Sequence, residues 1–412
     1  MVRPQTPRGA ERPRLRRLGA VLTSLCAIAA TLVAGPAHAA GPGGPCALPR
    51  SEAHHSEGLD TWNPSYPRPL GRLDAVMVFL SFPDSRPVAT PAQLAADHFP
   101  ATSRFFERAS YGRFTVRAHP VNRWFRMPRP STAYRIQRDW DGELRTAYLR
   151  DAIAAARGGV DFGRYGLVYL VADPDAPGVD SDATKVVNLD RPLEVDGAEL
   201  RRVVTVFEHH PPDRNVLAHE TGHVLDLPDL YHRPSEGKGD WDTHVGDWDL
   251  MGSQFGLASD PLGWHKWKLG WIDVRQVDCV TSRGSGLHTL LPLEERPRAG
   301  QDRPARLLVA RTGRTGAIVA EVRVASGNDA ATCAEGVLVY RVNSETPSGG
   351  GPVRVLDGHP ATQACAGEAV YPPLADAPLA VGETLEVKPE GVRITVQGRA
   401  PGGAWTVRMD KE

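Results

Sequence analysis

Apolar strands and amphipathic helices alternate along the first two thirds of the chain. Apolar, β-branched runs predict largely buried strands at 73–82, 167–172 and 202–207, and a further strand is expected at 113–118, after the turn at Tyr111-Gly112. Apolar residues at helical spacing predict helices at 91–110, 143–157 and 262–269. This alternation indicates an α/β (or α+β) layered domain, to which we assign residues 71–274.

The pattern changes after residue 274. Helical periodicity disappears, and short β-branched runs separated by Gly and Pro turns take its place at 305–310, 317–324, 337–342, 392–397 and 405–409. Short strands with turn signals between them predict an all-β, sandwich-like accessory domain over residues 275–412. Either substrate binding or stabilisation would be a suitable role for it.

Residues 1–39 have the pattern of an export signal. A basic stretch ends at Arg16-Arg17, an apolar run follows, and Ala37-His38-Ala39 places cleavage before Ala40. The alternative is a membrane anchor, but an apolar run of about 17 residues is short for a stable one. We therefore predict a secreted protein, in which residues 40–70, rich in Pro and Gly, form an extended tail that carries His54 and His55 in a solvated loop.

The composition of the 412-residue chain is ordinary for a globular protein, with 41% hydrophobic and 24% charged residues. Residues 1–39 contain six Arg and one acidic residue, so their removal leaves 42 basic and 48 acidic residues, a net charge of −6. A mildly acidic mature protein gives no reason to expect nucleic acid or an anionic membrane as a partner. The oligomeric state does not follow from the sequence.

Four cysteines remain once Cys26 is lost with the signal. An even number in an exported chain predicts two disulfides, and we favour Cys333–Cys365 together with Cys46–Cys279. In the alternative, Cys46 would bind a metal ion as an inhibitory thiolate.

The chemistry of the chain centres on residues 219–223, which read His-Glu-Thr-Gly-His. On a helix, His219 and His223 lie on one face and can reach one metal ion. Glu220 projects beside them, where a carboxylate can take a proton from an attacking water. Two imidazoles and a third ligand with one open position suit zinc.

Residues around this motif predict a helix with defined ends. Asp213 or Asn215 can cap its start, apolar residues such as Leu217 and Val224 give it a buried face, and Pro228 ends it.

The third metal ligand is expected six residues after His223, at Asp229, if the chain reverses sharply between them. Asp226 lies at this reversal, and Asp tolerates left-handed backbone geometry better than most residues. His232, His244 and Asp226 are the alternatives for the third ligand.

A second turn follows at 248–252, Trp-Asp-Leu-Met-Gly, which resembles a Met-turn. In such a turn the methionine, here Met251, forms an apolar floor beneath a zinc site. Asp249 is expected to fix the turn by hydrogen bonds to the backbone, and His265 is expected at the surface.

Residues 219–231, HETGHVLDLPDLY, resemble the signature of the immune inhibitor A-like family of secreted bacterial zinc metallopeptidases. Further blocks that are similar to this family lie at 79–84, 110–112, 124, 248–251, 268–272 and 336–342. The resemblance covers roughly residues 73–345, and the set of blocks is far more specific than the five-residue motif alone.

This resemblance implies a metzincin-like catalytic domain at 71–274 and endopeptidase activity on proteins or peptides. It implies one zinc ion bound by His219 and His223, with Glu220 as general base, and by position it supports Asp229 as the third ligand. The chain departs from the family at Asp226, where Gly is usual. An Asp-rich calcium loop is also missing, although Asp173, Asp175, Asp180 and Asp182 could form a different Ca²⁺ site or a solvated acidic loop.

The sequence therefore predicts a secreted zinc endopeptidase. Tyr231 and His244 are candidates for stabilising the oxyanion that forms when water attacks the peptide carbonyl. Alternatives are an exported binding or adhesive protein on an inactive peptidase scaffold, and a zinc hydrolase that acts on other bonds. Retention of Glu220 and both histidines favours catalysis.

Overall fold

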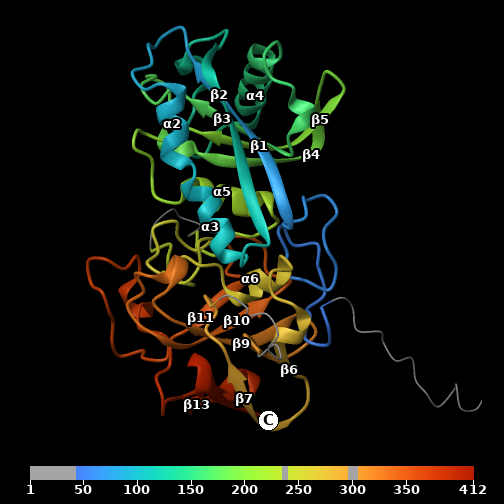
Figure 1. Cartoon of the computed structure of the whole chain (residues 1–412), viewed down its shortest axis with the longest axis vertical. Helices are drawn as coiled ribbons and strands as arrows, with labels where there is room; N and C mark the ends of the chain where they lie inside the picture. Colours follow the sequence, from blue (N-terminus) through green and yellow to red (C-terminus); the bar gives the residue numbers. More distant parts are fainter. Residues whose placement is uncertain (1–42, 234–239, 296–304) are drawn as a thin grey trace, which may run out of the picture. The chain divides into compact units, whose positions relative to one another are not determined.

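The computed structural model describes residues 43–233, 240–295 and 305–412. The predicted signal peptide, including Cys26, lies outside the described residues. Among those described, no helix combines the length and apolarity that a membrane crossing requires. The fold is mixed α/β, with three sheets and few helices (Figure 1).

The first sheet has the strand order β2-β1-β3-β5-β4. Its strands are β1 (Gly71–Ser81), β2 (Phe114–Arg126), β3 (Leu167–Ala172), β4 (Lys185–Val195) and β5 (Ala198–Val206). Strands β2, β1, β3 and β5 are parallel, whereas β4 pairs antiparallel with β5 and forms one edge. The four predicted strands are all present as β1, β2, β3 and β5, and β4 was not predicted.

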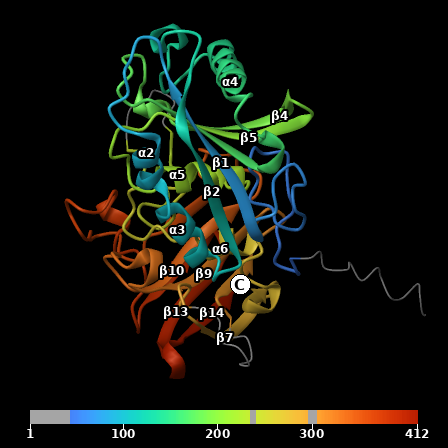
Figure 2. The same cartoon turned by 45° about the horizontal axis from the view of Figure 1, so that its top comes forward.

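Helices cover both faces of this sheet (Figures 1 and 2). Helix α4 (Gly142–Ala156) packs on one face, where Leu149 and Ile153 share a hydrophobic cluster with alternate strand residues such as Val203. Helices α2 (Pro91–His98), α3 (Ala101–Ala109) and α5 (Val216–Val224) pack on the other. The sequence predicted one helix over 91–110, but it is broken at Pro100, because proline disfavours helical backbone at the residue before it.

Two further sheets form the C-terminal part of the chain. One has the order β11-β10-β9-β8-β6 and the other β12-β13-β14-β7. Their bounds are β6 (Val277–Val280), β7 (Gly284–Leu290), β8 (Leu307–Arg311), β9 (Gly316–Arg323), β10 (Gly336–Asn343), β11 (Val353–Leu356), β12 (Thr384–Val387), β13 (Val392–Arg399) and β14 (Trp405–Lys411). Alternate residues of both sheets share one apolar cluster, so the sheets pack face to face.

The other face of the β6–β11 sheet packs against the first part of the chain. Leu307 and Tyr340 belong to the same core cluster as Trp264 of helix α6 (Gly263–Lys268) and Leu217 of α5. One hydrophobic core therefore crosses the predicted domain boundary at residues 274 and 275.

Residues 43–70 do not form the extended, solvated tail that the sequence predicted. They have no helix or strand of their own up to Leu70, yet Leu48, Ser56 and Glu57 are fully buried. His55 is also buried, at 6% exposure, because its ring nitrogen binds the carboxylate of Asp226. This segment, which we call the N-terminal strap, is part of the folded core.

Both predicted disulfides are confirmed. Cys46 is joined to Cys279 and Cys333 to Cys365, so Cys46 is not a metal-binding thiolate. Two disulfides fit an oxidising compartment.

We predict that the two disulfides differ in their contribution to stability. Cys46–Cys279 spans 233 residues and Cys333–Cys365 spans 32. Because the longer loop loses more entropy on closure, removal of Cys46–Cys279 should lower the free energy of unfolding by about 2 kcal/mol more than removal of Cys333–Cys365. Urea unfolding of the Cys46→Ala/Cys279→Ala and Cys333→Ala/Cys365→Ala variants measures this difference, and a larger loss for the second pair would contradict it.

Candidate metal centre

Helix α5 carries the His-Glu-Thr-Gly-His motif, as predicted. His219, Glu220 and His223 are all buried. The predicted side-chain cap is not formed. Asn215 occupies the N-cap position with a left-handed backbone, and its side chain makes no cap hydrogen bond. The helix ends at Val224, four residues before Pro228, because the chain already reverses at Asp226.

Asp226 adopts the left-handed conformation that the sequence predicted, with φ of 67°. Its carboxylate binds Arg50 at 2.8 Å and His55 at 2.9 Å, and both partners come from the N-terminal strap. Its carbonyl oxygen accepts a hydrogen bond from Lys268 Nζ at 2.7 Å. Burial opposes ionisation, but these positive neighbours hold the pKa of Asp226 below its usual value. Contacts with three cationic or polar side chains therefore stabilise the reversal, at a position where a glycine would adopt the left-handed backbone without strain.

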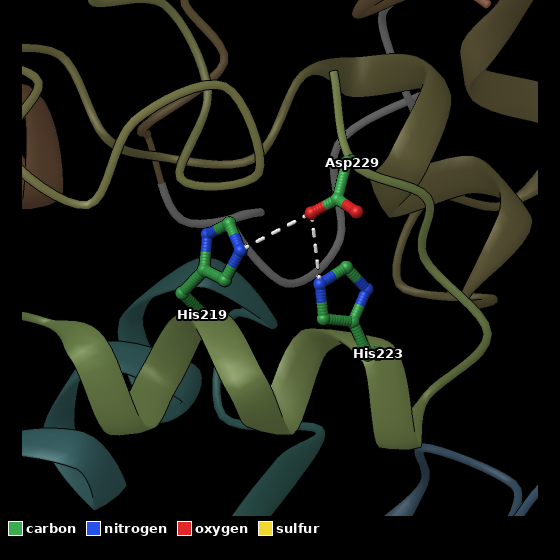
Figure 3. A group of neighbouring side chains, drawn as sticks. All are labelled: His219, His223 and Asp229. Atoms are coloured by element: carbon green, nitrogen blue, oxygen red, sulfur yellow. Dashed lines mark ion pairs between the residues drawn. The ribbon is translucent and has the colours of Figure 1, made fainter. Parts of the chain in front are cut away.

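The reversal brings Asp229 over the two histidines (Figure 3). Asp229 Oδ1 lies 3.4 Å from His219 Nε2 and 3.0 Å from His223 Nε2. Among the described residues, these three side chains are the group with metal-binding geometry. The alternatives for the third ligand lie elsewhere, because Asp226 binds the N-terminal strap while the rings of His232 and His244 contact each other.

The tautomers of both histidines are set by the backbone. Nδ1 of His219 donates a hydrogen bond to the carbonyl of Leu250, and Nδ1 of His223 donates to that of Leu227. Their Nε2 atoms therefore face Asp229 Oδ1, which is buried between them. Three electron-pair donors this close together require a positive charge between them, from a proton or from a metal cation.

Without a metal, that charge is a proton. Burial opposes protonation, but the Asp229 carboxylate raises the pKa of His223 to about 9. The observed spacing of 3.0 and 3.4 Å also matches the edge of a tetrahedral zinc site, about 3.3 Å for bonds near 2.0 Å. The donor set and its geometry therefore fit zinc.

The C-terminal part of the chain holds Asp229 in place. Ser348, in the loop between β10 and β11, receives a hydrogen bond from Asp229 N at 2.8 Å and donates one to Asp229 Oδ2 at 3.1 Å. The amide of Gly349 donates to the Asp229 carbonyl. No sequence pattern pointed to Ser348, because it lies 119 residues from its partner.

Met251 packs beneath the motif, where the sequence placed it. Its side chain is fully buried, and its sulfur lies 2.4 Å from the point that a Cβ on Gly222 would occupy. Gly222 is therefore required for this contact. As predicted, Asp249 fixes the turn, since its carboxylate accepts hydrogen bonds from the amides of Met251 and Leu262, both at 2.7 Å.

His265 is fully buried, so its predicted surface position is wrong. It binds Asp249 through Nδ1 at 2.9 Å and Glu57 through Nε2 at 2.8 Å. Burial opposes its charge, but Glu57 and Asp249 raise the pKa of His265 to about 10. The N-terminal strap therefore supports the turn of Met251 as well as the reversal at Asp226.

A cleft of about 770 Å³ opens over the three donors. It is lined by Glu220, by the edge of β4 and by Tyr231, whose ring stacks on that of His219. One oxygen of Glu220 accepts a hydrogen bond from the Val186 amide of β4 at 2.6 Å. Burial and the nearby Asp229 charge raise the pKa of Tyr231, so its hydroxyl keeps its proton. His244 does not line this cleft.

Three of the four acidic residues considered for calcium bind groups of the protein itself. Asp173 binds Ser85, Asp175 accepts from the Val88 amide, and Asp180 caps the short helical turn that contains Asp182. Asp182 itself lines the cleft.

Comparisons of the chain with models of known protein families and with curated proteins find no match. The functional argument therefore depends on the residues and their geometry.

We predict that Asp229→Ala lowers zinc affinity at least 100-fold, because loss of a residue that merely supports a ligand costs about 10- to 100-fold. Titration with zinc against a competing chelator measures this affinity. Asp182→Ala removes a carboxylate from the same cleft and should leave it unchanged. Equal affinity of both variants would show that Asp229 is not a ligand.

We predict that His265→Gln destabilises the protein by about 3–5 kcal/mol near pH 6, because the buried carboxylates of Glu57 and Asp249 both lose a cationic partner. The folded pKa of His265 is about 10, above the usual 6.5 of an unfolded chain, so its contribution is complete below pH 6.5 and is lost as the pH rises toward 10. The difference between wild type and variant in urea unfolding should therefore shrink between pH 6 and pH 9.5.

The control is His119→Gln, which breaks a half-buried pair with Asp74 and should cost less than about 1 kcal/mol. A difference for His265→Gln that grows with pH would refute the assignment of its charge.

Proposed function

We propose that the protein is a secreted zinc-dependent endopeptidase. The observation that carries this proposal is the convergence of His219 Nε2, His223 Nε2 and Asp229 Oδ1 on one point, with Glu220 beside them in an open cleft. The resemblance of residues 219–231 to the immune inhibitor A-like family, and with it a metzincin-like catalytic domain, supports the same reading. The predicted export signal and the two disulfides favour secretion.

His219, His223 and Asp229 would hold the zinc ion. When bound there, zinc acts as a Lewis acid that polarises the substrate carbonyl and lowers the pKa of water. Met251 packs against the helix that carries both histidines, and Asp249 holds the turn of Met251 in place. The backbone carbonyls of Leu250 and Leu227 accept hydrogen bonds from Nδ1 of the two imidazoles, so that Nε2 is the nitrogen available to bind the metal.

Glu220 acts as the general base. The Val186 amide holds its Oε2, which leaves Oε1 to accept the proton of the attacking water. The same carboxyl group then delivers this proton to the leaving amine as the peptide bond breaks. Tyr231, whose hydroxyl stays protonated, is the cleft residue suited to donate a hydrogen bond to the developing oxyanion.

The edge of β4 offers a binding surface for an extended peptide. Since the Val186 amide points away from β5, strand alternation directs the Val186 carbonyl and the backbone of Asn188 to the same open edge. The Asn188 side chain donates a hydrogen bond to the His223 carbonyl through Nδ2, and its buried Oδ1 has no partner among the residues that the structure describes. A substrate backbone that pairs with this edge would satisfy these groups.

We predict that Glu220→Gln abolishes proteolysis while zinc stays bound. Loss of a general base slows a reaction by about 10²- to 10⁴-fold, whereas Gln keeps the size of the side chain. The test uses residues 40–412 with one equivalent of zinc and measures casein hydrolysis together with bound metal.

The matched control is Glu199→Gln, at an exposed position of β5, which should retain full activity. Undiminished hydrolysis by Glu220→Gln would remove Glu220 from the mechanism. A wild-type protein that binds zinc yet cleaves neither casein nor any peptide of a mixed library would overturn the proposed function.

A further inference from the structure

A second cavity of about 290 Å³ lies next to the cleft, at the edge of β4. Three cationic side chains, Arg138, Arg145 and Lys185, line both this cavity and the cleft. We call the three the basic subsite. They come from the loop before α4, from α4 itself and from the first residue of β4.

The basic subsite carries more positive than negative charge. Within the described parts of the chain, neither Arg145 nor Lys185 forms an ion pair with a carboxylate. Asp139, the acidic residue among the described residues that line the cavity, binds Arg233 closely and lies 3.8 Å from Arg138. The cavity therefore carries net positive charge and attracts an anionic group.

Aromatic packing holds part of the basic subsite in position. The guanidinium of Arg138 lies 5.4 Å from the ring centre of Trp241, and that of Arg233 lies 5.9 Å from the same ring. Cation–π contact of this kind restrains a long side chain that would otherwise move freely. Trp241 in turn stacks on Tyr231 in the cleft. The subsite is thus connected to the reaction centre through packed rings.

Strand geometry places the basic subsite on the side of the sheet covered by α4. Val187 belongs to the cluster beneath α4, whereas Val186 packs against the cluster that contains α5. Since side chains alternate along a strand, Lys185 emerges on the same face as Val187, where Arg145 lies. A peptide that extends along β4 would also direct alternate side chains to this face.

The subsite lies close to the point of cleavage along such a peptide. Val186, the neighbour of Lys185, is the residue whose amide contacts Glu220. At about 3.3 Å per residue, a substrate side chain opposite Lys185 belongs within about three residues of the scissile bond.

We propose that the basic subsite binds an acidic side chain of the substrate, so that the enzyme prefers peptides with Asp or Glu within about three residues of the cleaved bond. This inference rests on the proposed peptidase function and specifies its substrate class. Carboxylate is the anion that an internal peptide residue commonly supplies, and Arg binds it through paired hydrogen bonds.

The test compares internally quenched peptides built on one casein sequence that the enzyme cleaves. Each of the three positions on either side of the scissile bond carries Glu, Gln or Lys in turn. At one position, Glu should give at least about 10-fold higher kcat/KM than Gln, chiefly through a lower KM, because a ground-state contact is gained. The preference should weaken in 0.5 M salt, since exposed charges are screened.

Variants of the basic subsite identify which of its residues bind the charged side chain of the substrate. Arg145→Glu should reverse the preference, so that the Lys peptide is cleaved faster than the Glu peptide. Arg145→Gln, which only removes the charge, should reduce the preference and serves as the test if Arg145→Glu does not fold. The matched control is Arg150→Glu, an exposed position of α4 that lines neither cavity, which should keep the wild-type preference.

Three further peptides separate other sources of an anion. One carries phosphoserine in place of Glu, and the other two end at that position, one with a free and one with an amidated C-terminus. Enhancement by phosphoserine alone, or by a free C-terminus alone, would overturn the acidic-side-chain proposal. Equal cleavage of Glu and Gln peptides at every position would overturn it as well, while leaving the peptidase function established. Absence of all cleavage would instead reject the peptidase function.

Discussion

The reversal of the chain at Asp226 determines whether a metal centre can form. His223 and Asp229 are six residues apart, and their donor atoms meet only because the backbone at Asp226 turns into the left-handed region. An aspartate is costlier there than a glycine, but its carboxylate gains Arg50 and His55 as partners. The side chain that strains the turn is therefore also the one that anchors it.

Buried charge connects this reversal to the rest of the structure. Lys268 binds the Asp226 carbonyl and lies 3.8 Å from Glu57, which binds His265, which binds Asp249 below Met251. A chain of ions removed from water contributes little net stability, but loss of one member leaves another unpaired. Here the chain of charged side chains connects the turn at Asp226 with the turn at Met251, the two turns that flank the proposed zinc ligands.

The sequence was sufficient for elements with strong local signals. Apolar runs predicted β1, β3 and β5, and a spacing of six residues identified Asp229. Strand β4 was missed because Lys185–Val195 is half exposed and contains Asp190 and Pro192, which are unusual in buried strands. Partners far apart in the sequence, such as His55 with Asp226, leave no local pattern, so buried charged residues were read as surface residues.

The hydrogen bonds between Ser348 and Asp229 make the geometry of the centre depend on a part of the chain that is synthesised late. A ribosome makes the histidine-bearing helix and Asp229 well before it reaches Ser348, 119 residues later. Until that loop is made and packed, the carboxylate lacks the contacts that fix its orientation. Completion of the chain is therefore a condition for fixing the orientation of Asp229, the third donor of the centre.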